Sequence, residues 1–123
     1  MRFILDTHIF LWALAEPQRI PEKKREEIES PSNRIYISSV SIAEMMIKAS
    51  LGKLKVDFDP VLEAENCGFE LLDFSGRDAL RLGELPFHHR DPFDRMLISQ
   101  SLATGTPIMT EDSKFRLYDC RII

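Results

Sequence analysis

The sequence predicts an α/β protein with a central, mostly parallel sheet of four or five strands and helices on both faces. Short apolar segments of strand-favouring residues recur along the chain, and a helix-like segment follows nearly every one of them. Strands and helices that alternate in this way form parallel sheets, because each helix carries the chain back across the sheet. The length of 123 residues and the absence of linkers or repeats fit one domain, residues 1–123.

The first strand is the best defined of these elements. Phe3–Leu5 is an apolar run without alternation, which is typical of a central strand that is buried on both faces. The run ends at Asp6, and a helix-like apolar segment, 9–15, follows at once. An acid at the carboxyl end of a buried strand lies where open α/β sheets place ligand groups. The alternative interpretation is that Asp6 or Thr7 simply caps the helix.

Caps, prolines and glycines delimit the remaining elements. Most expected helices begin at Ser, Asp or Pro, and several end at Gly, in line with the preferences of helix termini. The expected further strands are Arg34–Ser38, Phe69–Phe74, Ile108–Thr110 and a last one near Cys120–Ile122. The expected further helices are 21–31, 39–51, 60–67, 75–82 and 92–104.

The helix after the second strand combines an apolar stripe with an acid. Its apolar residues recur at helical spacing and are expected to face the core: Val40, Ala43, Ile47 and Leu51. Glu44 lies in the first turns of the same helix, next to this stripe. The helix therefore predicts a second acid close to the edge of the sheet where the first strand ends.

Four acids converge on that edge. Asp6 ends the first strand, Glu44 is early in the second-strand helix, Asp94 begins the helix before the fourth strand, and Asp112 follows that strand. A crossover helix runs antiparallel to the strands, so its start lies at their carboxyl edge. Crowded carboxylates repel one another and destabilise the fold unless a cation neutralises them. Oxygen ligands suit Mg²⁺ or Mn²⁺, ions that activate water and stabilise charge on a transferring phosphoryl group.

Each acid taken singly also has a structural interpretation. Glu44 stands at capping-box spacing from Ser41 and at ion-pair spacing from Lys48. Asp112 can cap the turn that follows it. Asp91, directly before a proline, is expected to act first as a helix cap and only second as a metal ligand. The convergence of several acids on one edge favours the functional interpretation over these separate ones.

Basic and polar residues flank the predicted acid edge. Arg90 and Arg95 are candidates for guiding a nucleic-acid backbone, with a solvated surface charge as the plain alternative. His89 belongs to a His-His pair that has no second pair of ligands at metal-site spacing. We expect it to contact substrate phosphate or to pack against Phe87. Thr7, next to the first acid, is included as an assisting residue.

Composition narrows the class of protein. The net charge of −4 argues against broad nonspecific binding to nucleic acid. It is compatible with a nucleic-acid enzyme, because the acids that bind a metal make the net charge more negative. No apolar run approaches the roughly 20 residues that span a bilayer, and no signal pattern is present, so no membrane association is expected. Cys67 and Cys120 are interpreted as buried thiols in a reducing cytoplasm, and Trp12 as a core residue.

The chain resembles a PIN domain, and more closely the VapC-type toxin ribonucleases of toxin–antitoxin pairs. The matching motifs are "ILDTHIFLW", "SVSIAEMMIKASLGKL" and "HHRDPFDRMLISQSLATGTPIMTED", followed by Phe115, whereas residues 57–85 match only in pattern. The resemblance implies a single PIN-like domain, a metal-dependent endoribonuclease with Mg²⁺ or Mn²⁺, an RNA substrate, a homodimer and an antitoxin that fills the acidic groove with a basic segment. Its catalytic, metal-binding acids correspond to Asp6, Glu44, Asp94 and Asp112, and an assisting hydroxyl corresponds to Thr110.

One departure and several alternatives remain open at this point. Glu111 stands where the family usually has a basic or variable residue, and it adds negative charge beside the site. A nuclease that processes RNA or acts on DNA would use the same acids. A non-catalytic PIN-like module is disfavoured, because a scaffold has no need to hold repelling carboxylates together. A receiver-like phosphorylation domain also clusters acids at the sheet edge, but this chain has no lysine after a late strand to close such a site.

Overall fold

The computed structural model describes all residues, 1–123, and confirms the α/β class. Four strands form one parallel sheet in the order β3-β2-β1-β4. The strands are β1 (Arg2–Leu5), β2 (Arg34–Ser38), β3 (Glu70–Leu72) and β4 (Ile108–Met109). The α-helices are α1 (Thr7–Ala15), α2 (Glu22–Glu29), α3 (Ser39–Ser50), α4 (Pro60–Asn66), α5 (Gly76–Leu80) and α6 (Pro92–Thr104). The 3-10 helices are η1 (Pro17–Arg19), η2 (Arg81–Glu84) and η3 (Ser113–Leu117).

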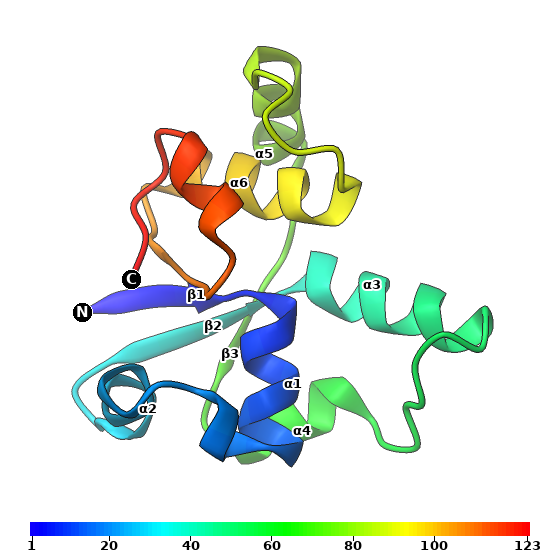
Figure 1. Ribbon diagram of the computed structural model, residues 1–123, viewed down its shortest axis with the longest axis vertical. Helices are drawn as coiled ribbons and strands as arrows, with labels where there is room; N and C mark the ends of the chain where they lie inside the picture. The colour runs from blue at the N-terminus through cyan, green and yellow to red at the C-terminus, as the bar shows by residue number, and fades with distance from the viewer.

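The central strand β1 explains why the core has two halves. Its three apolar residues are fully buried and alternate between the faces of the sheet. Phe3 and Leu5 join a cluster with residues of α1 and α4, whereas Ile4 joins a second cluster with residues of α6 and η3. Figure 1 shows α1, α2 and α4 on one side of the sheet and α5 and α6 on the other. The predicted three-layer arrangement is therefore confirmed.

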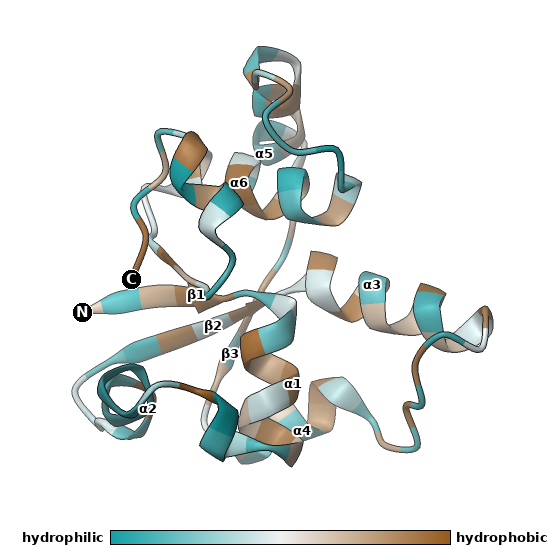
Figure 2. Ribbon diagram, viewed as in Figure 1, coloured by the Kyte–Doolittle hydropathy of each residue, from teal (hydrophilic) through white to brown (hydrophobic).

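The hydropathy of the elements follows their positions. Figure 2 shows brown, hydrophobic segments along β1 and β2 and on the helices that cover them, whereas α2 is almost entirely teal. No residue of α2 is buried, so this helix is solvated along its whole length. None of the helices is both long and apolar enough to cross a membrane.

The expected last strand is wrong in extent. Only Ile122 pairs with β4, through a single parallel bridge to Ile108. Residues 118–120 form a bend after η3, so the chain comes alongside β4 only at its final residues. The bridge is held by hydrogen bonds from Ile108 N–H to the Arg121 carbonyl and from Ile123 N–H to the Ile108 carbonyl, both 2.9 Å.

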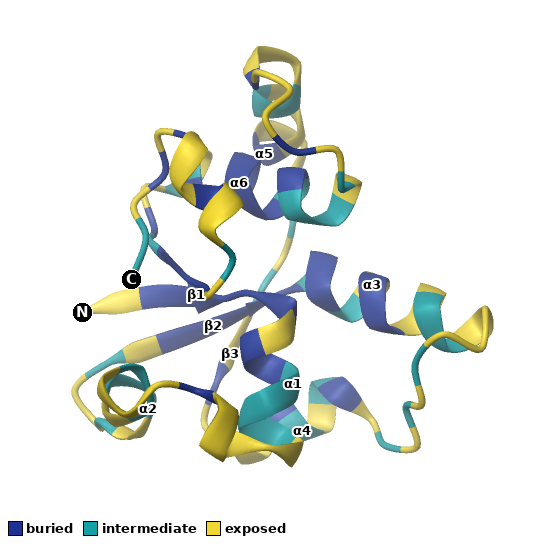
Figure 3. Ribbon diagram, in the orientation of Figure 1, coloured by how far each residue is buried: buried dark blue, intermediate teal, exposed yellow.

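The expected core stripe of α3 is also wrong. Val40 is buried, but Ala43, Ile47 and Leu51 are exposed, and Met45 contributes to the core instead. The reason is the direction of the helix: α3 starts at the sheet and then projects away from it, so only its first turns meet the core (Figure 3). Helical spacing shows that a face is apolar, but it does not show what covers that face.

The glycine that ends α6 yields a first prediction. Gly105 has φ of 66° and closes the helix in the left-handed region, which L side chains avoid. Gly105→Ala should lower the free energy of unfolding by about 1 kcal/mol. Gly76→Ala is the matched control, since neither added methyl group meets an atom within 4 Å and Gly76 has no positive φ. Urea unfolding of both variants makes the comparison, and equal effects would contradict this reason.

Candidate active site at the carboxyl edge of the sheet

Asp6 lies at the junction of β1 and α1 and is 4% exposed. One carboxylate oxygen accepts a hydrogen bond from the Ile9 backbone N–H at 2.7 Å and thereby caps α1. The other oxygen accepts a hydrogen bond from the Thr110 hydroxyl. Burial raises the pKa of the Asp6 carboxyl group, although these two hydrogen bonds oppose the shift. The cap interpretation is thus correct, and the same side chain still brings a buried charge to the sheet edge.

Thr110 connects this acid to the next one. Its hydroxyl donates to Asp6 and accepts from the Asp112 backbone N–H at 3.0 Å. The Asp112 carboxylate caps η3 by accepting from the Lys114 N–H at 2.9 Å, while its Oδ2 lies 3.6 Å from His89 Nε2. The hydroxyl expected to assist is therefore a bridge that fixes the spacing between two of the acids.

Glu44 is 3% exposed and presents its carboxylate at the same edge. Its Oε2 lies 2.5 Å from Lys48 Nζ, as the four-residue spacing predicts. Its Oε1 is buried and has no hydrogen-bond partner. The hydrogen bond with Glu44 raises the pKa of Lys48, and the charges of Asp91 and Asp94 act in the same direction. The ion pair leaves one oxygen of Glu44 without a partner, which is the state expected of a cation ligand.

The two aspartates at the start of α6 have different tasks. Asp91 is the cap, and its Oδ1 accepts from the Asp94 backbone N–H at 3.0 Å. Burial raises the pKa of Asp94 to about 6, with Asp91, Glu44 and Asp6 acting in the same direction and His89 against it. These mutual effects arise only if the charges lie close together. The structure therefore brings the predicted acids together at one edge.

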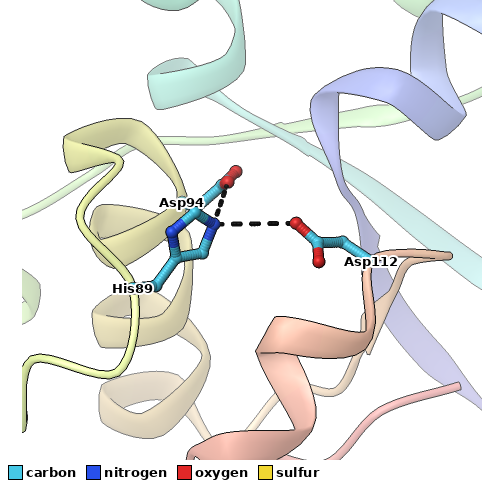
Figure 4. A group of neighbouring side chains, drawn as sticks. All are labelled: His89, Asp94 and Asp112. Carbon is cyan, nitrogen blue, oxygen red and sulfur yellow. Dashed lines mark ion pairs between the residues drawn. The ribbon is translucent and has the colours of Figure 1, made fainter.

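His89 lies within this group of acids (Figure 4). Its Nε2 is 2.8 Å from Asp94 Oδ2, and Asp112 Oδ2 lies on the other side of the ring nitrogen. Its Nδ1 accepts a hydrogen bond from the Asp91 N–H at 3.3 Å, which leaves Nε2 to carry the proton of the neutral ring. The ring packs edge-on against Phe115, with centroids 6.4 Å apart. It therefore faces the acids directly.

Of the two contacts expected for His89, packing against Phe87 is wrong, because Phe87 is 83% exposed and stacks on another residue, Arg95. Contact of His89 with substrate phosphate stays a prediction. The available clue to where the ring lies is local: His89 stands two residues before the cap Asp91, close enough for its ring to accept the first N–H of that turn. Side chains bonded to the cap of α6 are held near Asp94, which occupies the first turn of the same helix.

Arg95 has a framework role in place of the expected contact with substrate. It is 8% exposed, and its guanidinium lies 4.2 Å from the centroid of Phe87. Its Nη1 is 2.9 Å from the Pro86 carbonyl oxygen and 3.3 Å from the Tyr118 hydroxyl. The same hydroxyl accepts the His89 backbone N–H at 2.8 Å. Arg95 and Tyr118 thus hold the loop that brings His89 to the acids.

The other polar candidates differ in availability. The Thr7 hydroxyl donates to Ser41 Oγ at 2.8 Å in a buried bond that ties α1 to α3, so we assign Thr7 to the framework. Arg90 is exposed and forms no ion pair, so its contact with substrate stays a prediction. Glu111 is 2.8 Å from Lys24 Nζ, which neutralises the extra charge beside the site.

The donor set fits a hard divalent cation. Asp6 and Glu44 offer buried carboxylate oxygens, and Asp94 offers partly buried ones. One oxygen of Glu44 has no partner, and the raised pKa values of Asp6 and Asp94 indicate that their charged forms lack compensation. One ligand atom each of His89, Asp94 and Asp112 lies within 4.8 Å of the others. The imidazole Nε2 is therefore placed to contact a carboxylate, and it can bind an ion only after it loses its proton.

The family comparison covers nearly the whole chain. The family model described as "PIN domain" matches residues 3–119. Among curated protein sequences, none matches the chain.

Several solved structures share the fold. VapBC2 from Rickettsia felis, bound to a DNA fragment from their promoter, gives a TM-score of 0.75 at 22% identity, covering 100% of this chain and 98% of that chain. DNA-bound VapBC from Salmonella typhimurium gives 0.74 at 22% identity, with 100% and 97% covered. VapBC-5 from Mycobacterium tuberculosis, a member of the VapBC family of toxin-antitoxin systems, gives 0.60 at 16% identity, with 99% and 95% covered. At such identities the likeness shows a common fold.

The raised pKa of Asp94 predicts how stability without metal depends on pH. The unfolded state loses this proton near the ordinary pKa of 3.8, and the folded state loses it near 6. Between these values the folded state binds more protons, so stability falls as pH rises. The destabilisation is absent below about pH 4 and complete above about pH 6. At pH values above 6 it lowers the free energy of unfolding by an amount on the order of 3 kcal/mol.

Asp94→Asn should remove most of this pH dependence. Unfolding by urea at pH 4 and pH 7 in the presence of a chelator measures it. Millimolar Mg²⁺ or Mn²⁺ at pH 7 should raise the melting temperature of the parent protein more than that of the variant. An identical pH dependence in both proteins would show that Asp94 is not the group that titrates.

Proposed function

Because the chain belongs to the PIN domain family, we propose that it is a metal-dependent endoribonuclease and the toxin of a toxin–antitoxin pair. The observation that carries the proposal is the acid group itself. Asp6, Glu44 and Asp94 come from three separate elements and meet at one edge, in company with Asp112. A protein that needed only stability would not gather repelling charges there.

The residues of the chain divide the work between binding and orientation. Asp6, Glu44 and Asp94 would hold Mg²⁺ or Mn²⁺, and Asp112 would complete or polarise the site. The bound cation would neutralise these acids and activate a water molecule for attack on a phosphodiester phosphorus. Thr110 fixes Asp6 relative to Asp112 through its hydroxyl, independently of any ion.

Several observations support RNA and a protein partner as the molecules that this site meets. Arg90 is exposed and stands between His89 and Asp91 in the sequence, so it is a candidate for contact with a phosphate backbone. The relatives of similar fold are VapBC complexes, which supports an antitoxin as partner. Exposed apolar residues on α3 and at its C-cap, among them Ile47 and Leu51, form the kind of surface that a protein covers. A homodimer and a cytoplasmic location belong to the same proposal.

Cleavage assays on two neighbouring variants test the catalytic part. Asp94→Asn keeps the size of the side chain but removes a charge that a hard cation needs, so cleavage should fall by at least about 10²-fold. Asp91→Asn should leave most cleavage intact, because Asn caps a helix nearly as well as Asp. The measurement is the rate of cleavage of RNA and of DNA with Mn²⁺, Mg²⁺ or neither.

Circular dichroism of both variants serves as the folding control. An inactive Asp91→Asn variant together with an active Asp94→Asn variant would show that Asp91, and not Asp94, is the metal ligand. Cleavage that is as fast with a chelator as with Mn²⁺ or Mg²⁺ would show that the reaction does not depend on a metal ion. Cleavage of DNA alone would favour the second candidate, a DNA nuclease with the same site.

Growth assays test the toxin part separately. The parent, expressed alone in bacteria, should arrest growth, because a free ribonuclease attacks cellular RNA. Asp6→Asn and Glu44→Gln should relieve the arrest at equal protein levels, since each removes one charge of the acid group. Equal arrest by the parent and both variants would show that cleavage is not its cause.

A further inference from the structure

A cavity of about 370 Å³ opens from the acid group and runs along α1. Asp6 and Asp112 of the acid group line its wall, and so do Trp12 and Arg19, which the proposed chemistry does not use. Its lining residues are Asp6, His8, Ile9, Trp12, Arg19, Glu111 and Asp112. A strand of nucleic acid that is cut at the acids must pass over the neighbouring surface, and this cavity is part of it.

Trp12, which the sequence assigns to the core, packs against the core cluster but is not enclosed by it. It is half-buried, and it borders both this cavity and a second one of about 530 Å³. His8 precedes it by four residues on α1, so both rings lie on one face, with centroids 6.3 Å apart. The Arg19 guanidinium lies 4.6 Å from the centroid of the Trp12 ring. An aromatic ring and a planar cation thus stand together beside the acids.

The charges of the cavity favour a nucleotide over a basic peptide. Lys24 neutralises Glu111, and a bound cation would neutralise Asp6 and Asp112. Arg19 is then the remaining charge of the lining. Its ion pair with Glu16, at 3.0 Å, is half-exposed and therefore weak, so a phosphate can replace it. A basic segment would meet a like charge at this position.

We propose that His8, Trp12 and Arg19 form a nucleobase-binding subsite for a nucleotide next to the cleaved phosphodiester. The proposal rests on the proposed ribonuclease function. Bases of single-stranded RNA stack on aromatic side chains and on guanidinium planes, and every base offers such a face. The subsite therefore contributes affinity for single strands and little choice of sequence. Its loss should raise KM and leave kcat nearly unchanged.

The single tryptophan of the chain makes the subsite directly observable. Trp12 is the only one, so its fluorescence reports on this position alone. With Mg²⁺ present, adenosine monophosphate should quench it in a saturable manner, whereas ribose 5-phosphate, which lacks the base, should not. Arg19→Gln should weaken the quenching. Arg77→Gln, which removes an exposed arginine from α5, is the matched control and should leave it unchanged.

Cleavage kinetics provide the second measurement. Trp12→Leu should raise KM for a single-stranded RNA about 10-fold, the scale of one lost base stack, and Trp12→Phe should restore most of the affinity. Melting temperatures show whether each variant is folded. If Trp12→Leu does not fold, Arg19→Gln and the quenching of the parent decide the question.

The failures of the two proposals are distinguishable. Saturable quenching by adenosine monophosphate in a protein that cuts no RNA would support the subsite and reject the ribonuclease. An active ribonuclease whose fluorescence responds equally to both phosphates, with KM unchanged in a folded Trp12→Leu, would overturn the subsite. Quenching by a basic peptide but not by the nucleotide would also overturn it and assign the cavity to a protein partner.

Discussion

Mutual repulsion of buried carboxylates is the constraint on which the arrangement around the sheet edge depends. The parallel topology brings Asp6, Glu44 and Asp94 to the same edge, where burial raises the pKa of Asp6 and of Asp94 and so disfavours their charged forms. The surrounding polar groups each offset part of this cost. Lys48 pairs with one oxygen of Glu44, and His89 stands between Asp94 and its neighbours. The compensation is incomplete, as the unpartnered oxygen of Glu44 shows, and a cation would complete it.

The site also depends on residues that do not point toward this edge of the sheet but hold the site residues in place. The guanidinium of Arg95 donates hydrogen bonds to backbone carbonyls of the loop before α6. The Tyr118 hydroxyl accepts hydrogen bonds from that guanidinium and from the His89 N–H. These bonds fix a loop that has no regular structure of its own. A change at Arg95 would therefore act on the acids through His89, without touching them. Lys24 has a similar function on the other side, because it binds both Glu111 and the Thr110 carbonyl.

The sequence predicted the features that depend on residues close together in the chain, and it failed for those that depend on distant elements. The run Phe3–Leu5 and the caps at Asp6 and Asp91 depend on neighbours in the chain, so local patterns were sufficient. The convergence of the acids followed from topology, which the alternation of strands and helices determines. The exposure of Ile47 and the burial of Arg95 depend on which distant element lies opposite, and a periodic pattern carries no such information.

The hydroxyl bridge from Thr110 to Asp6 has a consequence for protein synthesis. Asp6 leaves the ribosome 104 residues before its partner Thr110, and Asp112 and Tyr118 follow later still. β1 likewise lacks its second neighbour until β4 has emerged. A nascent chain therefore holds an incomplete set of carboxylates without the framework that orients them. The arrangement in which the acids meet therefore requires the segment from β4 to Tyr118, and a nascent chain from which that segment has not yet emerged carries no assembled site.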